Sequence, residues 1–528
     1  MDLILHNARI YSMQSEKDIY EAIAVKDGLI KGLGKNQDIL KMATTNTQII
    51  DLNHKMVFPG FNDSHMHLLG LGASLSQVDL SHAKSIDDII ETTKHFIKDN
   101  NIEAGKWVVG RGWNQDFFAD NFMPDAIDLD DISDDHYIFL RRACGHVATC
   151  NSRVLEDFDF PMAYTSIDGG SYENGIFKEN ALELITSKMA LPSKEDLKTW
   201  IKAGCHYANS LGITSVQSDD LCVYPESHNQ TVFSSFYELD ADNSLSVRVY
   251  EQSLLRNINI LKDQIKAGYQ QNKGSLFFKL GPLKILGDGS LGGRTAWLNE
   301  PYHDAPNESG IHMYSQEDLN DYVLEAHKHD ISSAIHCIGD KMLDSAIEAI
   351  ELAQAKVAKA NLRHGIVHCQ ITRPDQLKKL KDLDIMTYVQ PVFLDYDAHI
   401  VRDRVGKLAE TSYNFKSMMD LDIRMSFGSD APVDSTDPIQ GIHCAVTRKD
   451  LNNKPEEAYL PDQAVSVYQA IYNYTVESAY ASYEEDIKGK LIKDYLADIV
   501  VLEGDIFNQI LDSSVFMTIV GGRIVYQK

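Results

Sequence analysis

Short apolar runs recur along the chain and alternate with longer amphipathic stretches. From residue 58 onward eight such runs are candidate strands, most of them separated by the roughly thirty residues of a strand–helix unit. They are the run ending in His65-Met66-His67 and the segments 213–217, 246–250, 277–285, 332–336, 365–368, 385–389 and 424–428. Eight strands that alternate with helices predict an α/β fold, a (β/α)8 TIM-like barrel.

Both ends of the chain have a different pattern, with short strands and tight turns. Asp27-Gly28 and the Gly32-Leu33-Gly34 region are typical of hairpin turns in the N-terminal segment, and the last forty residues have a similar pattern. We expect residues 1–57 and 485–528 to form one small composite β-sandwich. The alternative is two unrelated β appendages.

The spacing of the barrel strands has one large exception. Between the first and second strands lie roughly 140 residues, many more than a loop and one helix need. This stretch has strand-like segments at 107–110 and 137–140 and a helix-like segment at 86–97. We predict a barrel domain over 58–484 that includes an inserted subdomain at 70–205. Active sites lie at the C-terminal face of such barrels, and we expect the insertion to cover that face.

The composition is that of a soluble globular protein, with 44% hydrophobic and 24% charged residues among 528. A net charge of −27 argues against a nucleic-acid partner. The chain has no signal-peptide pattern and no apolar run long enough for a membrane span. Seven cysteines without Cys-x-x-Cys pairs argue against a disulfide framework. We therefore expect a cytoplasmic protein that acts on a small molecule, with a homodimer as the default assembly.

The first barrel strand ends in two histidines one residue apart, His65 and His67. On an extended strand, residues i and i+2 point to the same side, so both imidazoles can reach one ion. Imidazole is a common ligand of zinc and similar metals. By itself the His-x-His pattern is a weak signal.

Four further strand ends carry chemically active side chains. These are Lys284 on strand four, His336 on strand five, His368 on strand six and Asp430 on strand eight. Each has an ordinary structural explanation: a hydrogen-bonded histidine, a lysine that reaches out to solvent, or an aspartate in a turn. The carboxyl ends of barrel strands meet around one pocket, however, and six such residues at that end indicate a functional site.

With these motifs the sequence resembles the amidohydrolase superfamily, and within it the group of N-substituted formamide deformylases. The motifs that carry the resemblance are Pro59-Gly60-Phe61-Asn62-Asp63-Ser64-His65-Met66-His67, Lys284 with Asp288-Gly289-Ser290-Leu291-Gly292, His336-Cys337-Ile338-Gly339-Asp340, His368-Cys369-Gln370 and Gly428-Ser429-Asp430-Ala431-Pro432.

The resemblance implies a divalent metal site, with zinc as the expected metal and one or two ions per chain. His65 and His67 would bind one ion together with Asp430, and His336 and His368 would bind a second. Lys284, carboxylated by CO₂, would bridge them. Many relatives have a glutamate just before the histidine of strand six, where this chain has Val367. The hydrogen bonding around His368 is therefore expected to differ.

The function that follows is metal-dependent hydrolysis of a C–N bond of amide or formamide type in a small molecule. Asp430 would move the proton between water and the leaving nitrogen. In the insertion, His146 is either a catalytic contact or a structural histidine. Asp288, Arg294 and Trp113 are the candidate substrate-binding residues. Two alternatives stay open: a deaminase or cyclic-amide hydrolase on the same fold, and a non-catalytic scaffold.

Overall fold

A computed structural model describes residues 1–142, 147–167, 170–179 and 181–528. These residues form two compact units. The larger unit contains Met1–Gly72 and Leu197–Lys528, and the smaller contains Ala73–Asp196. Among the described residues, none of the helices combines the length and the apolar character that a membrane span requires.

The larger unit is built around an eight-stranded parallel sheet that forms a nearly closed barrel. The two edge strands meet where the amide of Asp430 donates a 2.8 Å hydrogen bond to the carbonyl of His65. The predicted eight-stranded barrel sheet is confirmed. In sheet order, beginning with the first strand along the chain, the strands are β8 (Phe61–Met66), β16 (Ile213–Ser218), β17 (Arg248–Leu254), β18 (Phe278–Leu286), β19 (Ser333–Cys337), β20 (Gly365–His368), β21 (Met386–Val389) and β22 (Met425–Phe427).

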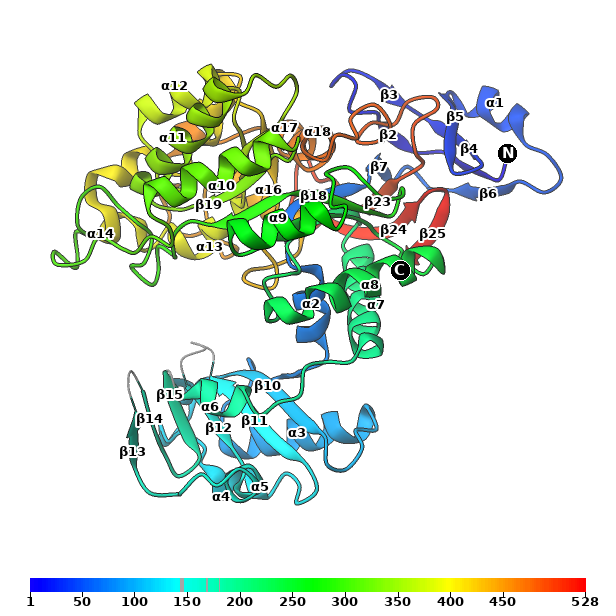
Figure 1. Cartoon of the computed structure of the whole chain (residues 1–528). Coiled ribbons are helices and arrows are strands. Elements are labelled where there is room, and N and C mark those ends of the chain that lie inside the picture. Colours follow the sequence, from blue (N-terminus) through cyan, green and yellow to red (C-terminus); the bar gives the residue numbers. More distant parts are fainter. Residues whose placement is uncertain (143–146, 168–169, 180) are drawn as a thin grey trace. The chain divides into compact units, whose positions relative to one another are not determined.

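Amphipathic helices follow most of these strands and pack against the sheet. In α11 (Asp340–Lys356), Leu343, Ile347 and Ile350 repeat at three- and four-residue spacing and are buried, as expected for a helix with one apolar face. Figure 1 shows α11 lying between α10 (Gln316–Lys328) and α12 (Pro374–Asp382). The other longer helices of this unit are α7 (Lys194–Ser210), α8 (Asn229–Ala241), α9 (Ile258–Lys266), α16 (Pro438–Thr447) and α17 (Val467–Tyr472).

Strands from both ends of the chain share one sheet, as Figure 1 shows for the blue β7 and the red β24 and β25. This six-stranded sheet runs in the order β25 (Arg523–Gln527), β24 (Ser514–Val520), β23 (Ile499–Glu503), β7 (Met56–Pro59), β2 (Arg9–Tyr11) and β3 (Ile19–Tyr20). A four-stranded sheet lies beside it, in the order β5 (Leu29–Gly34), β4 (Ala22–Lys26), β1 (Leu3–His6) and β6 (Gln48–Asp51). Buried apolar side chains of both sheets form one hydrophobic cluster.

A single residue joins this terminal sheet to the barrel. Gly60 separates β7 from β8, and a Cβ atom there would lie 2.2 Å from the side chain of Thr214. Only glycine permits so close an approach between the two strands. The strand that carries His65 is therefore fixed at its start by the terminal sheet.

The histidine motif is fixed at its other end by a close helix crossing. In α2 (Leu68–Leu75), a Cβ atom on Gly72 would lie 1.8 Å from the carbonyl oxygen of Trp200 in α7. On the other helix, a Cβ atom on Gly204 would lie 2.7 Å from the carbonyl oxygen of Leu68. The two glycines let the backbones approach and hold the segment directly after His67.

The smaller unit has its own sheet and core. Its strands, in sheet order, are β13 (Thr165–Ile167), β14 (Gly170–Glu173), β15 (Ile176–Glu179), β12 (Val147–Cys150), β11 (Tyr137–Arg142), β10 (Trp107–Trp113) and β9 (Val78–Asp79), accompanied by α3 (Ile86–Asp99), α4 (Ala126–Asp130), α5 (Ser152–Asp157) and α6 (Leu182–Thr186). Two clusters of buried apolar side chains form its interior.

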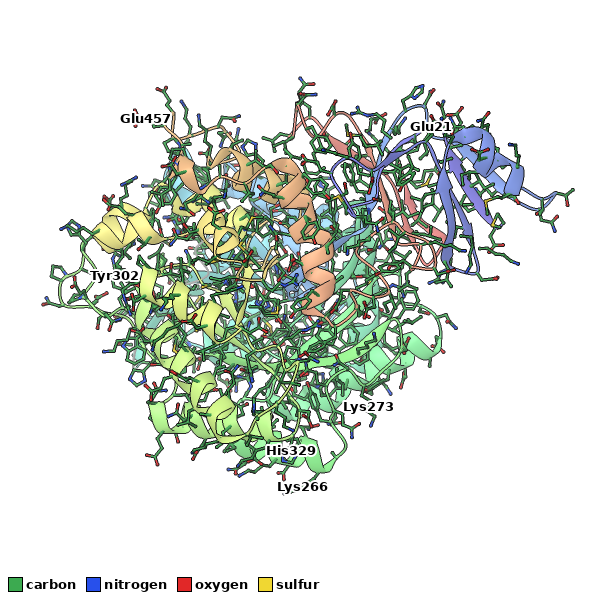
Figure 2. The ribbon with its side chains drawn as sticks, turned by 90° about the horizontal axis from the view of Figure 1, so that it is seen from above. Glu21, Lys266, Lys273, Tyr302, His329 and Glu457 are labelled. Atoms are coloured by element: carbon green, nitrogen blue, oxygen red, sulfur yellow. The ribbon has the colours of Figure 1, made fainter. Side chains whose placement is uncertain are left out.

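Charged side chains mark the outer surface of the larger unit. Figure 2 labels Lys266, Lys273, His329 and Glu457 at the outer edge of the ribbon. Lys266 pairs with Asp263 one helical turn away, and both side chains are largely exposed. Such pairs contribute little to stability, so the larger unit is held together by its core.

Candidate metal centre

Two histidines and a carboxylate meet where the first and last barrel strands end. The Nε2 atoms of His65 and His67 lie 3.3 Å and 3.1 Å from Oδ1 of Asp430. The ligand-type atoms of these three residues all lie within 4.8 Å of one another. This spacing is short enough for a single metal ion to contact all three groups.

The other two predicted histidines lie beside this group. His336 Nδ1 and His368 Nε2 are 3.0 Å apart, and the rings of His368 and His65 are 5.7 Å apart, centre to centre. Sheet pairing brings them together, because Leu286 pairs with His336 and Cys337 pairs with His368. The structure therefore gathers all four histidines at the carboxyl ends of the strands.

The orientation of the two strand-one histidines is fixed by polar partners behind them. His65 Nδ1 lies 2.7 Å from Oε1 of Gln252, and His67 Nδ1 lies 2.6 Å from the carbonyl oxygen of Asp219. Since a carbonyl oxygen can only accept, each Nδ1 carries the proton. At His65 the Nε2 lone pair is then available to a metal ion. His67 Nε2, 3.1 Å from Oδ1 of Asp430, carries a second proton that a metal ion would displace, because a carboxylate can only accept.

The strand-five and strand-six histidines are oriented in the same way. His368 Nδ1 lies 2.8 Å from Oε1 of Gln390, and His336 Nε2 lies 3.1 Å from the carbonyl oxygen of Gly289. The unprotonated nitrogens, Nε2 of His368 and Nδ1 of His336, therefore face each other. Imidazoles held from behind by acceptors are the usual environment of metal-binding histidines, and the donor set of these four fits a divalent metal.

Lys284 lies inside this cluster and is almost completely buried. Its Nζ atom is 2.9 Å from His65 Nε2 and 3.8 Å from Oδ2 of Asp219. Both carboxylate oxygens of Asp219 are buried without a hydrogen bond. A lysine and a carboxylate without hydrogen bonds at this depth are costly for stability, which favours a functional role for both.

Burial and neighbouring charges shift the pKa values in the cluster. Burial, followed by the positive charge of Lys284, lowers the pKa of His65 to about 3 and that of His336 to about 4. Burial lowers the pKa of His67 as well, but Cys222 and Asp430 outweigh it and raise that pKa well above 6.5. Burial raises the pKa of Asp430, yet its hydrogen bonds with His65 and His67 bring it well below 3.8. His67 and Asp430 therefore form a charged pair, with the proton on the imidazole.

Two residues of the cluster have unusual backbone conformations. His368 has a φ of +73° and Asp430 has a φ of +61°. Side chains other than glycine rarely adopt this left-handed region, and such strain concentrates at functional sites. His368 is the last residue of β20, and Asp430 lies in the loop that follows β22.

The structure places three predicted substrate-binding residues as follows. The carboxylate of Asp288 accepts hydrogen bonds from the backbone of Trp297, Ile338 and Gly339, and it lies 3.4 Å from His336 Nε2. Arg294 forms a two-pronged ion pair with Asp304.

Trp113 is fully buried in the smaller unit, where its ring N–H donates to the carbonyl of Leu140. This position favours a role in the core of the insertion. The other residue predicted from the insertion, the catalytic candidate His146, lies outside the described residues.

Sequence reasoning missed four residues that surround the histidines: Asp219, Cys222, Gln252 and Gln390. The Cys222 thiol lies 3.2 Å from His67 Nδ1. Asp219 and Cys222 directly follow β16, Gln252 lies in β17 and Gln390 directly follows β21. β16, β17 and β21 are the second, third and seventh barrel strands, which were predicted from their apolar residues alone. The polar residues at the ends of these strands could have revealed the partners of the histidines.

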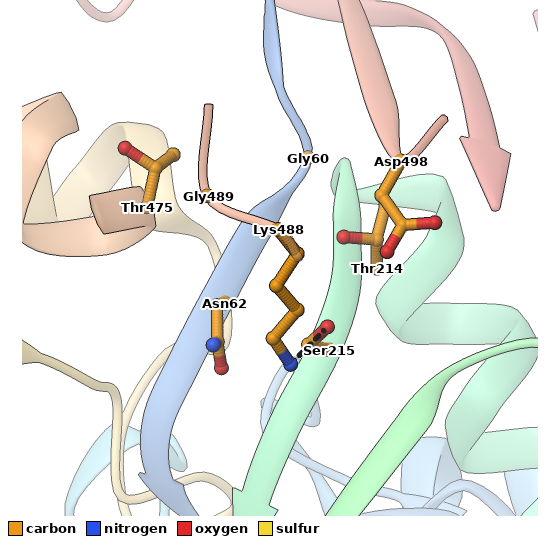
Figure 3. Close-up of a pocket in the computed structure, with 8 residues that line it drawn as sticks. All are labelled: Gly60, Asn62, Thr214, Ser215, Thr475, Lys488, Gly489 and Asp498. Carbon is orange, nitrogen blue, oxygen red and sulfur yellow. Dashed lines mark hydrogen bonds between the residues drawn. The ribbon is translucent and has the colours of Figure 1, made fainter. Parts of the chain in front are cut away.

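A small cavity lies toward the opposite end of the barrel, where β8 and β16 begin (Figure 3). It measures about 10 Å³, the space of about one water molecule. Lys488 Nζ reaches in and hydrogen-bonds with Ser215 Oγ at 3.0 Å. Residues at this end of a barrel serve stability, so the strand-end cluster remains the candidate site.

Comparison with known proteins agrees with this geometry. The sequence profile of the amidohydrolase family matches residues 48–526. A Bacillus subtilis protein, YtcJ, which is named as an amidohydrolase, is 31% identical over 553 residues, and the alignment covers all of both chains. The N-substituted formamide deformylase of Arthrobacter pascens is 23% identical over 555 residues, covering 100% of this chain and 98% of that protein.

A solved structure is also similar over nearly its whole length. The crystal structure of an uncharacterized metal-dependent hydrolase from Pyrococcus horikoshii has a TM-score of 0.80 and 29% sequence identity. The match covers 95% of this chain and 97% of that chain. The larger part of the fold is therefore shared with a metal-dependent hydrolase.

Proposed function

The chain belongs to the amidohydrolase family, and we propose that it hydrolyses a C–N bond of amide or formamide type in a small molecule. The observation that carries the proposal is the convergence of four oriented histidines, Lys284 and Asp430 at the carboxyl ends of the barrel strands. The name of the Arthrobacter relative, which aligns over its whole length, supports a formamide-type substrate.

In this proposal His65, His67 and Asp430 hold one divalent ion and His336 and His368 hold a second, with zinc as the first metal to test. When bound, such ions would polarise the scissile carbonyl and favour ionisation of the attacking water. Lys284, in its carboxylated form, would supply an anionic oxygen between the two histidine pairs. Its Nζ atom lies 2.9 Å from His65 Nε2, within reach of such a bridge.

Asp430 is the proposed proton carrier. Its hydrogen bonds with His65 and His67 keep its pKa well below 3.8, so the carboxylate is ionised near neutral pH and can accept a proton on an oxygen. It then donates this proton to the nitrogen that leaves. An amine is a poor leaving group unless it is protonated, so the same carboxylate serves both steps.

The test is hydrolysis of a panel of N-formyl and N-acyl amines by the metal-loaded protein and by Asp430→Asn. We expect Asp430→Asn to keep most of its metal and to lose activity by about 10²- to 10⁴-fold, because the amide cannot carry the proton. An exposed substitution, Asp403→Asn, is the matched control for the change in charge. Full turnover by Asp430→Asn with its metals in place would contradict the proton role. Activity restricted to aminated rings or cyclic amides would redirect the proposal to a deaminase or cyclic-amide hydrolase.

A further inference from the structure

A cavity of about 270 Å³ opens beside the histidine cluster, within the larger unit. Its walls come from loops that follow β18, β19, β20, β21 and β22, at the carboxyl ends of five successive strands. Ligands of barrel enzymes bind among these loops. The volume exceeds the roughly 150 Å³ that holds a benzene molecule, so a short alkyl chain with a terminal group fits.

Contacts connect this cavity directly to the cluster. Phe393, in its wall, stacks on the ring of His368 with 5.7 Å between the ring centres and 17° between the planes. Val433, also in the wall, donates its amide to the carbonyl of Asp430 at 2.9 Å. A substrate whose reacting bond lies at the cluster can therefore extend into the cavity.

One buried amide in the wall offers a hydrogen-bond acceptor without a donor. Gln370 is 2% exposed, and its Nε2 donates to Oδ2 of Asp397 and to the hydroxyl of Tyr413. Its Oε1 has no hydrogen-bond partner among the described residues. A buried acceptor without a donor is costly for stability, and a ligand N–H group would satisfy it.

Two carboxylates in the wall also lack a positive partner. Both hydrogen bonds that Asp397 accepts end on Oδ2, so Oδ1 has none within the described chain. Asp434 is half-buried, and the backbone of Ser435 donates to its Oδ1 at 2.7 Å. Neither carboxylate forms an ion pair with a basic side chain of the described residues. The nearby guanidinium of Arg404 is itself paired with Asp304.

The electrostatics of the two carboxylates agree with a missing positive charge. Burial raises the pKa of Asp397 to about 6. Burial, together with the charges of Asp395, Asp397 and Asp430, raises the pKa of Asp434 to about 6. A cation bound between Asp397 and Asp434 would stabilise their ionised forms.

The remaining wall suits the same kind of group. Phe393 and the exposed Tyr396 supply aromatic faces, which attract cations, and Leu291 and Ile338 supply apolar surface for a short alkyl chain. Within the described part of the chain, no lysine or arginine lines the cavity.

We propose that this cavity binds a positively charged nitrogen group of the substrate, a primary ammonium or guanidinium carried on a short alkyl chain next to the amide. The carboxylates of Asp397 and Asp434 pair with the charge, and Gln370 Oε1 accepts one of its N–H groups. This substrate class rests on the proposed amide hydrolysis, because the cluster beside the cavity supplies the reaction.

The experiment compares two substrates of equal length, N-formyl-1,5-diaminopentane, which carries an ammonium, and N-formylhexylamine, which carries a methyl group in its place. With the metal-loaded wild-type enzyme, we expect kcat/KM to be at least about tenfold higher for the charged substrate, since charge-assisted hydrogen bonds are the stronger kind. Asp434→Asn should lower this ratio by about tenfold, mostly through the KM of the charged substrate. Asp403→Asn, which removes the same charge from an exposed position on α14 (Val401–Val405), should leave the ratio unchanged.

A binding measurement separates this proposal from the proposed function. Calorimetry compares 1,5-diaminopentane with 1,5-pentanediol on the wild type and on Asp434→Asn. Tighter binding of the diamine, lost in Asp434→Asn, without turnover of either amide, would support the cavity and overturn the amide hydrolysis. Turnover of both amides with equal kcat/KM, or with a preference for the neutral one, would overturn the cation site and leave the hydrolysis standing. The wild-type comparison decides this even if a variant folds poorly.

Discussion

The Nδ1 atom of His368 lies 2.8 Å from Oε1 of Gln390, a residue at the end of the neighbouring strand β21. Val367, which precedes this histidine, has no side-chain acceptor, so the ring needs another source of orientation. Gln390 provides it. The hydrogen bond fixes the tautomer of His368 and aims its Nε2 atom at His336.

Removing this support should weaken metal binding without removing a ligand. We expect Gln390→Leu to lower metal affinity by about 10- to 100-fold, the usual effect of losing a partner behind a metal-binding histidine. Gln252→Leu, behind His65, should act in the same way. Competition with a chelator measures both affinities.

Gln354→Leu is the matched control, because Gln354 bonds to the carbonyl of Leu383 on the outer helices. Equal affinity in Gln390→Leu, Gln354→Leu and the wild type would show that the position of Gln390 beside His368 has no bearing on the metal.

The barrel could be predicted from the sequence because its strands are short apolar runs with regular spacing. Seven runs after His67 were recognised, and each overlaps an observed strand, as 365–368 coincides with Gly365–His368. The end of each run then pointed to His336, His368 and Asp430. Because the carboxyl ends of barrel strands meet around one pocket, the predicted strand ends were enough to locate the candidate metal ligands.

Other parts of the site depend on contacts that a sequence does not reveal. Gln252 lies beyond the predicted end of its strand, and only the pairing of β17 with its neighbours brings it behind His65. The ion pair of Arg294 with Asp304 likewise depends on how one loop folds back, so an arginine beside a glycine-rich motif was assigned to the substrate. The role of Arg294 in substrate binding stays a prediction.

A buried ion pair between the barrel and the terminal sheet should be important for stability. Arg248 in β17 donates two hydrogen bonds to Asp498, at 2.7 Å and 2.9 Å, and both side chains are almost fully buried. Asp498→Ala leaves the guanidinium buried without its partner, which we expect to cost about 3–5 kcal/mol of unfolding free energy. Chemical unfolding measures this loss.

The double variant Arg248→Met/Asp498→Leu should recover most of that stability, because no unpaired charge remains. Lys266→Met, at an exposed pair, should change stability by less than about 1 kcal/mol. A loss in Asp498→Ala no larger than in Lys266→Met would contradict the assigned role of the buried pair.

A buried histidine pair away from the metal cluster makes stability depend on pH. His364 Nδ1 accepts from the amide of Ser333, and its Nε2 lies 2.9 Å from Nδ1 of His327. Burial, followed by the effect of His327, lowers the pKa of His364 to about 3, below the ordinary value of 6.5. Between these values the unfolded chain binds a proton that the folded chain does not, so stability falls as the pH is lowered from about 6.5.

In that range, we expect His364 to lower the free energy of unfolding by about 1.4 kcal/mol for each unit by which the pH falls. Unfolding of the wild type and of His364→Gln at several pH values between 6.5 and 4 measures the difference in slope. His329→Gln, at a largely exposed position, is the control. Parallel slopes for all three proteins would mean that His364 takes up a proton in the folded state.

The most direct test of the account is the metal content per chain of protein purified without chelator, measured by elemental analysis beside Lys284→Ala. We predict about two equivalents of divalent metal in the wild type, a clear loss in Lys284→Ala, and hydrolysis of N-formyl amines only by the loaded protein. No metal in the wild type, and no hydrolysis after zinc is added back, would contradict the proposal that this cluster is a catalytic metal centre.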